Sequence, residues 1–365
     1  MNRPLRAIIA DDSALYRAVL VRTLSTLGNV EVVAHAANGA EAVELVRKHG
    51  PDLMTLDLNM PVLDGIGTLR ALREAKLCCE VIIVSSETRQ GAAATLEALQ
   101  LGAVDFITKP TEENVKVSSD LLGYELRRQL AAIRLRRDRR LRLQEPRASS
   151  AKMAASPSLD KLSAPIVAAS TLPPEIVAIG TSTGGPAALP VLLGALPSDL
   201  GVPVLIVQHM PPLFTASLAE ALDRKCLLSV VEGHNGQIVL KNHIYIAPGG
   251  RHMKVKRAFD KSVRLVITDD PPVNHCRPSV DVTFRSIAEE YGGRVVAAIL
   301  TGMGNDGVAG LRALKALGAQ VIAQDEATCT VFGMPHEAIR AAVVDSVRPL
   351  DRIAPTIVTA LHSNG

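Results

Sequence analysis

Short apolar runs of strand type alternate with helical segments along this chain, and no other sequence feature restricts its fold as much. Such an alternation predicts parallel strands that are joined by crossover helices on both faces of a sheet. We therefore expect a doubly wound (βα)5 domain over residues 1–125. The strand-like runs in this region are Arg6–Ala10, Val30–Ala34, Leu53–Leu58, Val81–Ser85 and Val104–Thr108.

A second α/β block occupies residues 173–365, and it too predicts a mostly parallel sheet with helices on both sides. Residues 126–172 join the two blocks. They predict a helix extension that passes into a linker, since the later part is rich in serine and proline without periodicity. The strand-like runs of the second block are Ile176–Ile179, Val202–Gln208, His243–Ala247, Arg264–Thr268, Val295–Leu300 and Gln320–Gln324. Its expected helices are Pro186–Leu196, Phe214–Arg224, Val280–Tyr291, Val308–Leu317 and Pro335–Ala342.

Charge and aromatic content argue against a nucleic-acid-binding protein. The formal net charge of the 365-residue chain is only +3, and tryptophan is absent. Aromatic residues make up only 2% of the chain, so few side chains are present to stack on bases. The arginines gather between Arg127 and Arg147, and a basic run of this kind is usually a solvated helix face or a linker.

The sequence predicts a cytoplasmic protein that is not an integral membrane protein. The N-terminus leads directly into the first strand-like run and lacks the features of a signal peptide. No apolar run reaches the ~18 residues that a membrane-spanning helix needs. The five cysteines form no C-x-x-C pair, so reduced thiols are the simplest interpretation.

Charged and hydroxyl side chains follow several strands of the first block. Asp11 and Asp12 follow the first strand, Asp57 ends the third, Ser85 ends the fourth and Lys109 follows the fifth. The carboxyl ends of parallel strands meet at one edge of a doubly wound sheet. Carboxylates grouped with a lysine and a hydroxyl favour a site for Mg²⁺ and a phosphoryl group. Any single aspartate could instead cap a helix.

These residues carry a resemblance to the receiver domains of two-component response regulators. The resemblance implies that Asp57 accepts a phosphoryl group from a histidine kinase. Asp11, Asp12 and Asp57 would hold Mg²⁺, Lys109 and Ser85 would contact the phosphoryl oxygens, and Phe106 would be the switch aromatic. The motifs are Ala10–Ser13, Leu56–Gly65, Val84–Ser86 and Phe106–Pro110.

Ser182 is the candidate nucleophile of the second block. It lies in a G-x-S-x-G pattern that starts at Gly180 and follows a strand-like run. A serine on a sharp strand-to-helix turn projects its hydroxyl clear of the sheet. A glycine-rich turn can also cradle a phosphate, although this one has no P-loop lysine next to its glycines.

A serine nucleophile needs a general base and an orienting carboxylate. His209 follows the strand Val202–Gln208, and Asp306 follows the strand Val295–Leu300. Both residues are therefore expected at the sheet edge that carries Ser182. Asp325, after the next strand, competes with Asp306 for the third position. A cap or a turn is the alternative explanation for each of these residues.

The second block resembles the catalytic domain of chemotaxis-type protein-glutamate methylesterases. The resemblance implies a phosphorylation-activated serine hydrolase with the triad Ser182, His209 and Asp306. The backbone N–H of Met303 would bind the oxyanion, and Thr181 and Thr183 would line the site. The motifs are Ile179–Pro186, Gln208–Pro211, Ile244–Met253, Arg277–Phe284 and Leu300–Gly307.

The implied substrate is a glutamyl methyl ester of a methyl-accepting chemoreceptor, cleaved with release of methanol in sensory adaptation. Receptor glutamines would be deamidated at the same site, and the esterase step would need no metal. The alternative is a phosphorylation-gated interaction module whose second domain binds without chemistry. No triad member is missing, which favours the enzyme.

Overall fold

The structure is a computed structural model, and it describes residues 3–86, 88–109, 115–144 and 172–362. The chain forms two compact units, Met1–Arg142 and Leu143–Gly365. Each unit contains a parallel sheet with helices on both faces, which confirms the expected fold class. The later part of the expected linker, residues 145–171, lies outside the described residues.

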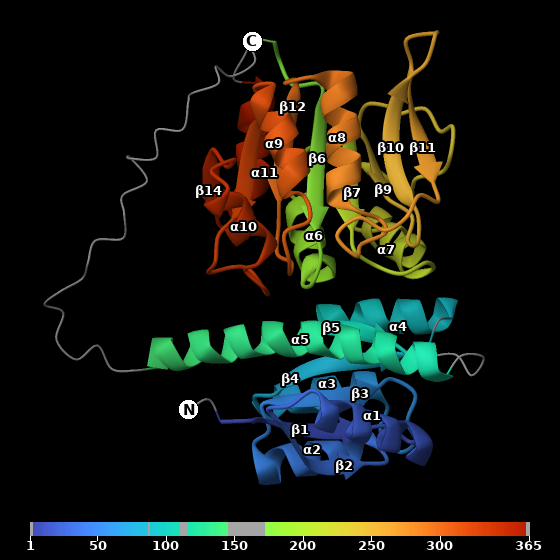
Figure 1. The fold of residues 1–365 in the computed structure, drawn as a ribbon, viewed down its shortest axis with the longest axis vertical. Helices are drawn as coiled ribbons and strands as arrows, with labels where there is room; N and C mark the ends of the chain where they lie inside the picture. The colour runs from blue at the N-terminus through green and yellow to red at the C-terminus, as the bar shows by residue number, and fades with distance from the viewer. Residues whose placement is uncertain (1–2, 87, 110–114, 145–171, 363–365) are drawn as a thin grey trace, which may run out of the picture. The chain divides into compact units, whose positions relative to one another are not determined.

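The first unit contains a five-stranded parallel sheet in the order β2-β1-β3-β4-β5 (Figure 1). From β1 the chain first adds β2 on one side, and it then adds β3, β4 and β5 in turn on the other side of β1. This change of direction opens a crevice at the carboxyl ends of β1 and β3. The strands are β1 (Leu5–Ala10), β2 (Val30–Ala36), β3 (Leu53–Asp57), β4 (Glu80–Ser85) and β5 (Asp105–Thr108).

Helices cover both faces of this sheet. α1 (Ala14–Thr26) and α5 (Val115–Gln144) share one core with the sheet, in which Leu24 and Leu126 are fully buried. The other helices of the unit are α2 (Gly39–His49), α3 (Gly65–Glu74) and α4 (Arg89–Gln100). Each of these three begins at a polar cap, namely Asn38, Asp64 and Thr88, which satisfies a free backbone N–H of the first turn.

The prediction that the basic run is only a solvated face is wrong for part of α5. Arg137 is buried, its guanidinium lies 3.7 Å from a carboxylate oxygen of Asp52, and it donates to the carbonyl of Arg3. Arg136 lies 3.3 Å from Glu80. The helix extension is therefore packed against the amino-terminal edge of the first sheet. Helical periodicity cannot reveal this, because the acidic partners lie far away in the sequence.

We expect Arg137→Ala to lower the free energy of unfolding of a fragment covering residues 1–144 by ~1–3 kcal/mol, because it removes charged hydrogen bonds at a buried position. Arg127→Ala is the matched control. Arg127 is exposed on the same helix, and its removal should change stability by less than ~0.5 kcal/mol. Urea unfolding of the three fragments measures both effects, and equal stabilities would contradict the packing described here.

The second unit contains a seven-stranded parallel sheet in the order β14-β13-β12-β6-β7-β9-β8. Its core is formed by fully buried side chains such as Val280 and Phe284. The strands are β6 (Ile176–Thr181), β7 (Val204–Gln208), β8 (Ser229–Glu232), β9 (His243–Ile246), β12 (Val295–Ile299), β13 (Gln320–Gln324) and β14 (Ser346–Arg348).

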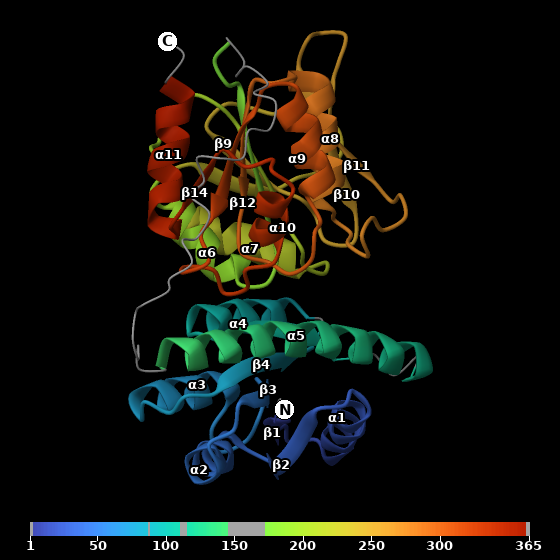
Figure 2. The same cartoon turned by 60° about the vertical axis from the view of Figure 1, so that its left-hand side comes forward.

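The helices of the second unit lie in two layers, which Figure 2 shows on opposite sides of the sheet. All five expected helices are present. The last helix, with Pro355 inside it, was not expected. One layer holds α6 (Gly185–Leu193), α7 (Phe214–Asp223) and α11 (Leu350–His362), and the other holds α8 (Val280–Tyr291), α9 (Val308–Ala316) and α10 (Met334–Arg340).

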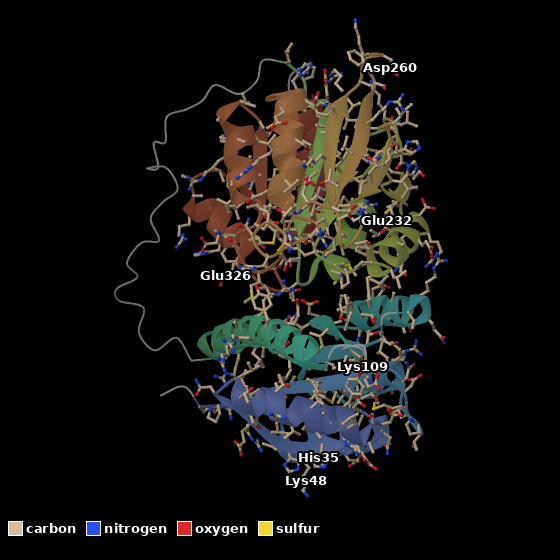
Figure 3. All side chains as sticks on the ribbon, turned by 45° about the vertical axis from the view of Figure 1, so that its right-hand side comes forward. His35, Lys48, Lys109, Glu232, Asp260 and Glu326 are labelled. Atoms are coloured by element: carbon tan, nitrogen blue, oxygen red, sulfur yellow. The ribbon has the colours of Figure 1, made fainter. Side chains whose placement is uncertain are left out.

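The expected strand Arg264–Thr268 exists but does not belong to the parallel sheet. It forms β11 (Val263–Thr268), which pairs antiparallel with β10 (His252–Arg257) in a separate hairpin. Asp260 lies at the tip of this hairpin (Figure 3), where its carboxylate accepts from the backbone N–H of Ser262. Alternate residues of β11 are buried, which is typical of a strand with one solvent-facing side. Over the described residues, no helix is long and apolar enough to cross a membrane.

Candidate active site

Three neighbouring strands place the candidate triad at one edge of the second sheet. β6 lies between β12 and β7. Ser182 directly follows β6, His209 directly follows β7, and Asp306 lies in the loop after β12. The register supports this proximity, since the backbone N–H of His209 donates to the carbonyl of Thr181 and that of Ser182 donates to Thr301.

Ser182 is buried rather than projecting into solvent, with 1% of its surface exposed. Its Oγ has no hydrogen-bond partner among the described residues. The turn is made by Gly184, whose φ of +84° favours glycine. The serine therefore carries a free hydroxyl immediately before the N-terminus of α6. Buried polar groups without a partner are uncommon, and a catalytic role is one of the recognised explanations.

Gln208 connects the backbone segments of Ser182 and His209. Its side-chain amide donates to the carbonyl of Ser182 over 2.9 Å and to that of His209 over 3.2 Å. Gly185 leaves room for this side chain, because a Cβ at position 185 would lie 1.9 Å from Oε1 of Gln208. Gln208 therefore fixes the spacing between the two segments. No role for this glutamine is predictable from its sequence pattern.

His209 and Asp306 are in direct contact. Nε2 of the imidazole lies 2.8 Å from Oδ2 of Asp306, and both side chains are buried. Nδ1 of the same ring faces Sγ of Cys276 at 3.7 Å. The structure thus brings the histidine and the aspartate together, whereas no hydrogen bond joins the histidine to the serine. Such bonds are often long or absent before substrate binds.

Asp306 also caps α8. Its carboxylate accepts from the backbone N–H groups of Val280 at 2.6 Å and Asp281 at 3.3 Å, and from Oγ of Ser279 at 2.8 Å. The positive end of a helix stabilises a carboxylate at this position. Asn274 donates a further bond to Asp306 at 3.0 Å and one to Asp281 at 2.8 Å. These contacts hold the carboxylate in one orientation.

The pKa values of the pair have shifted in opposite directions. Burial lowers the pKa of His209, but its contacts with Asp306 and Cys276 outweigh burial and raise this pKa to about 9. Burial raises the pKa of Asp306, and the hydrogen bonds that it accepts outweigh burial and lower this pKa to about 2. An imidazolium and a carboxylate therefore face each other at neutral pH.

Asp325, the competitor for the third position, lies elsewhere. Its carboxylate accepts from the backbone N–H of Thr328 at 2.9 Å and from the Oγ1 of Thr328 at 2.6 Å. This is the turn arrangement that short acidic side chains commonly form. The contact with His209 therefore belongs to Asp306, and Asp325 stabilises a local turn.

The loop that carries Met303 lies close to Ser182. A Cβ on Gly302 would come within 2.8 Å of the Cβ of Ser182. The carbonyl of Gly302 accepts from the backbone N–H groups of Gly333 and Met334, which fixes the loop. The role of the Met303 backbone N–H as the oxyanion donor stays a prediction.

Thr181 and Thr183 lie on either side of Ser182 and are buried. Oγ1 of Thr181 donates to the carbonyl of Thr301 at 3.0 Å, and the hydroxyl of Thr301 donates to the carbonyl of Thr183 at 2.9 Å. These bonds tie the serine turn to the loop after β12. Contact of either threonine with substrate stays a prediction.

The sequence did not indicate Asn274, Cys276 or Ser279 as site residues. All three lie between β11 and α8, a segment without strand or helix periodicity. Asn274 has a φ of +53° and His275 a φ of +61°, and asparagine tolerates this conformation better than most residues. An Asn at this position could have signalled a turn, but not its contact with Asp306.

The acidic site of the first unit forms at the crevice between β1 and β3. Nζ of Lys109, labelled in Figure 3, lies 2.7 Å from Oδ2 of Asp57 and 2.9 Å from Oδ2 of Asp11. Burial raises the pKa of Asp57, and the lysine only partly offsets this. Burial lowers the pKa of Lys109, but its two carboxylate partners outweigh burial and raise it.

The same site fits a hard divalent cation. Carboxylate oxygens of Asp11, Asp12 and Asp57 all lie within 4.8 Å of one another. One lysine faces these three carboxylates, so negative charge is in excess, and carboxylate oxygens are the ligands that Mg²⁺ prefers. A Mg²⁺ ion here would supply charge neutralisation for an incoming phosphoryl group.

Ser85 ends β4, which pairs with β3, and Phe106 lies on β5. Oγ of Ser85 is 3.3 Å from the carbonyl of Gly91, which belongs to α4, and Phe106 is buried on β5. Their expected roles, contact with the phosphoryl group and switching, stay predictions.

Known proteins match both units. The family model described as CheB methylesterase matches residues 177–357, and that of the response regulator receiver domain matches residues 7–118. A protein-glutamate methylesterase/protein-glutamine glutaminase of Desulfotalea psychrophila is 41% identical over 97% of this chain and 98% of its own. The chain belongs to the CheB methylesterase family. A protein of the same name from Archaeoglobus fulgidus is 44% identical over 98% of each chain.

A solved structure supports membership of this family for the second unit. The CheB methylesterase catalytic domain of Thermotoga maritima is 41% identical, with a TM-score of 0.50, and the match covers 51% of this chain and 98% of that domain. The resemblances identified from the sequence are therefore confirmed for both units. In this CheB family member, a receiver domain precedes the methylesterase domain.

Proposed function

We propose that this protein is a protein-glutamate methylesterase and protein-glutamine glutaminase whose activity is controlled by phosphorylation of its receiver domain. The buried contact of 2.8 Å between His209 and Asp306 carries the proposal. It joins residues from the ends of two strands that flank the one before Ser182. A base and an orienting acid beside a free serine hydroxyl are the parts that acyl transfer needs.

In the proposed mechanism, Ser182 attacks the carbonyl carbon of a glutamyl methyl ester. Because Nε2 of His209 is held by Asp306, Nδ1 is the ring nitrogen that accepts the serine proton. Asp306 keeps the ring in this tautomer and stabilises the imidazolium that forms. Backbone N–H groups, with Met303 the expected donor, bind the oxyanion; losing one such donor typically costs on the order of 10²–10³ in rate. Methanol leaves, and water then releases the acyl group from Ser182.

The substrate of the proposed reaction is a methyl-accepting chemoreceptor, and the reaction serves sensory adaptation. A receptor glutamine would react through the same steps with ammonia as the leaving group. Incubation of the protein with methylated receptor membranes and measurement of methanol tests the proposal directly. A protein that binds these membranes and releases no methanol would instead be an interaction module.

Control is proposed to act through Asp57. A histidine kinase of the chemotaxis system would transfer a phosphoryl group to its carboxylate. Asp11 and Asp12 would hold Mg²⁺ together with Asp57, and Lys109 and Ser85 would bind the phosphoryl oxygens. No step of ester cleavage requires a metal.

We expect a small phosphodonor such as acetyl phosphate, with Mg²⁺, to raise methanol release by ~5–150-fold, the range of typical coupling energies. Asp57→Ala should remove this response and keep the basal rate. Asp64→Ala is the control, since Asp64 only caps α3, and it should keep the response. Stimulation of the Asp57→Ala protein would place the phosphorylation site elsewhere.

The raised pKa of His209 gives the enzyme a defined pH dependence. The imidazole must be neutral to accept the serine proton, so kcat/KM should rise with pH until about pH 9 and then level off. Below this pH, kcat/KM should increase ~10-fold for each pH unit. Measurement of kcat/KM from pH 6 to 10, with Ser182→Ala as the blank for alkaline ester hydrolysis, tests this. A midpoint near 6.5 would mean that Asp306 does not stabilise the imidazolium.

A further inference from the structure

Cys276 lies beside both His209 and Asp306, and one ligand atom from each of the three residues lies within 4.8 Å of the other two. Its Sγ is 3.7 Å from Nδ1 of the ring, while Nε2 contacts Asp306. The thiol is half-buried, and the imidazole that it faces is buried. The mechanism above assigns Cys276 no role.

The segment that presents Cys276 is fixed by its backbone. Val273 and Cys276 exchange two backbone hydrogen bonds, of 3.1 and 2.9 Å. The two residues between them, Asn274 and His275, both have positive φ, the geometry of a type I′ turn. The side chain of Asn274 anchors this turn to Asp306. The thiol therefore occupies a defined position relative to the ring.

The contact between His209 and Asp306 matches an arrangement that is common behind metal-binding histidines. Histidines that bind a metal usually donate their other ring nitrogen to a carboxylate, which fixes the tautomer and the ring orientation. In its neutral form with the hydrogen on Nε2, His209 leaves the lone pair of Nδ1 available, and Sγ of Cys276 lies 3.7 Å from that nitrogen. Asp306 itself accepts five bonds from protein groups, which hold it in place as a support for the histidine.

We propose that Nδ1 of His209 and Sγ of Cys276 bind a thiophilic divalent cation of the zinc class, and that this ion inhibits the esterase. Zinc bonds of about 2.3 Å to sulfur and 2.0–2.1 Å to nitrogen, at a tetrahedral angle, place the two atoms about 3.5 Å apart. The observed separation is 3.7 Å. Water fills the remaining positions.

Inhibition follows because the ion binds Nδ1, the ring nitrogen that the proposed mechanism uses as the base. Binding displaces the proton of the thiol and any proton on Nδ1. The lone pair that would accept the serine proton is then shared with the metal, and Ser182 loses its base. This part of the inference rests on the proposed function, whereas ion binding does not.

Binding is measured on the full chain with Co²⁺ as a spectroscopic probe for the zinc site. Excess Mg²⁺ occupies the acidic site of the receiver, and a phosphine keeps the thiols reduced without chelating the metal. We expect the absorption of a cobalt–thiolate bond, lost when Zn²⁺ is added. Cys276→Ser should weaken cobalt binding by at least ~10–100-fold, because substitution of a residue that only supports a metal ligand already costs this much. Cys226→Ser, at another half-buried cysteine of the same unit, should retain the band.

Two further measurements separate the parts of the inference. Asp306→Asn should weaken cobalt binding by ~10–100-fold through loss of the supporting carboxylate, and Asp325→Asn should not. Zn²⁺ should abolish methanol release reversibly with a chelator, and Cys276→Ser should need at least ~10-fold more Zn²⁺.

The outcomes are distinguishable. No thiolate band, or a band that persists in Cys276→Ser, overturns the site. A band at Cys276 with Zn²⁺-resistant methanol release overturns the inhibition. Absence of methanol release from the metal-free wild type counts against the proposed function and leaves the cobalt result to decide the metal site.

Discussion

Replacing Ser182 with alanine is expected to reduce methanol release by up to ~10⁶-fold, the loss observed when the nucleophile of a serine triad is removed. The protein should nevertheless fold at least as stably as the wild type. Oγ of Ser182 is buried and has no partner, and removing an unsatisfied buried hydroxyl does not break a hydrogen bond. Loss of activity without loss of stability is therefore the signature of this change.

Ser198→Ala is the matched control. Ser198 is exposed in the same unit, and its replacement should alter neither methanol release nor thermal unfolding. Single-turnover assays on methylated receptor membranes, with melting curves of the same samples, provide both readouts. Wild-type turnover in the Ser182→Ala protein would show that another residue is the nucleophile.

Asp306→Asn is expected to reduce kcat by on the order of 10⁴, a smaller loss than at the nucleophile, because the aspartate acts through the histidine. It should also move the rise of kcat/KM with pH from about 9 toward the ordinary histidine value of 6.5, since the carboxylate that favours the imidazolium is gone. A purely structural role for Asp306 would lower activity without moving this midpoint.

Asp325→Asn separates the two aspartates that the sequence left in competition. Its carboxylate holds only a local turn with Thr328, so the pH profile should keep its midpoint and kcat should stay near the wild-type value. If Asp325→Asn were the more damaging change, the assignment of the third triad member would be wrong.

Much of the site was predictable because its residues follow strands. Ser182, His209 and Asp306 each come after an apolar run, and parallel strands bring such positions to one edge. The alternation of strands and helices predicted both sheets for the same reason. Strand β8 and strand β14, of four and three residues, were not expected because such short segments show no clear period.

The residues around the triad could not be predicted from local pattern. Asn274 and Cys276 lie in a turn without period, and their partners are distant in sequence. The buried position of Arg137 involves Asp52, which lies 85 residues earlier in the sequence. Strand β11 was expected in the main sheet, because periodicity identifies a strand but not the strand with which it pairs, and its actual partner, β10, was not expected at all.

The double use of Asp306 also bears on how this domain could lose its activity during evolution. A substitution at Ser182 removes the nucleophile and leaves every hydrogen bond of the framework in place. A substitution at Asp306 leaves the first backbone N–H groups of α8, the hydroxyl of Ser279 and the amide of Asn274 without their common acceptor. Selection for a stable fold would thus preserve the aspartate after selection for hydrolysis had ended. Descendants that kept only a binding role should retain Asp306 and vary at Ser182.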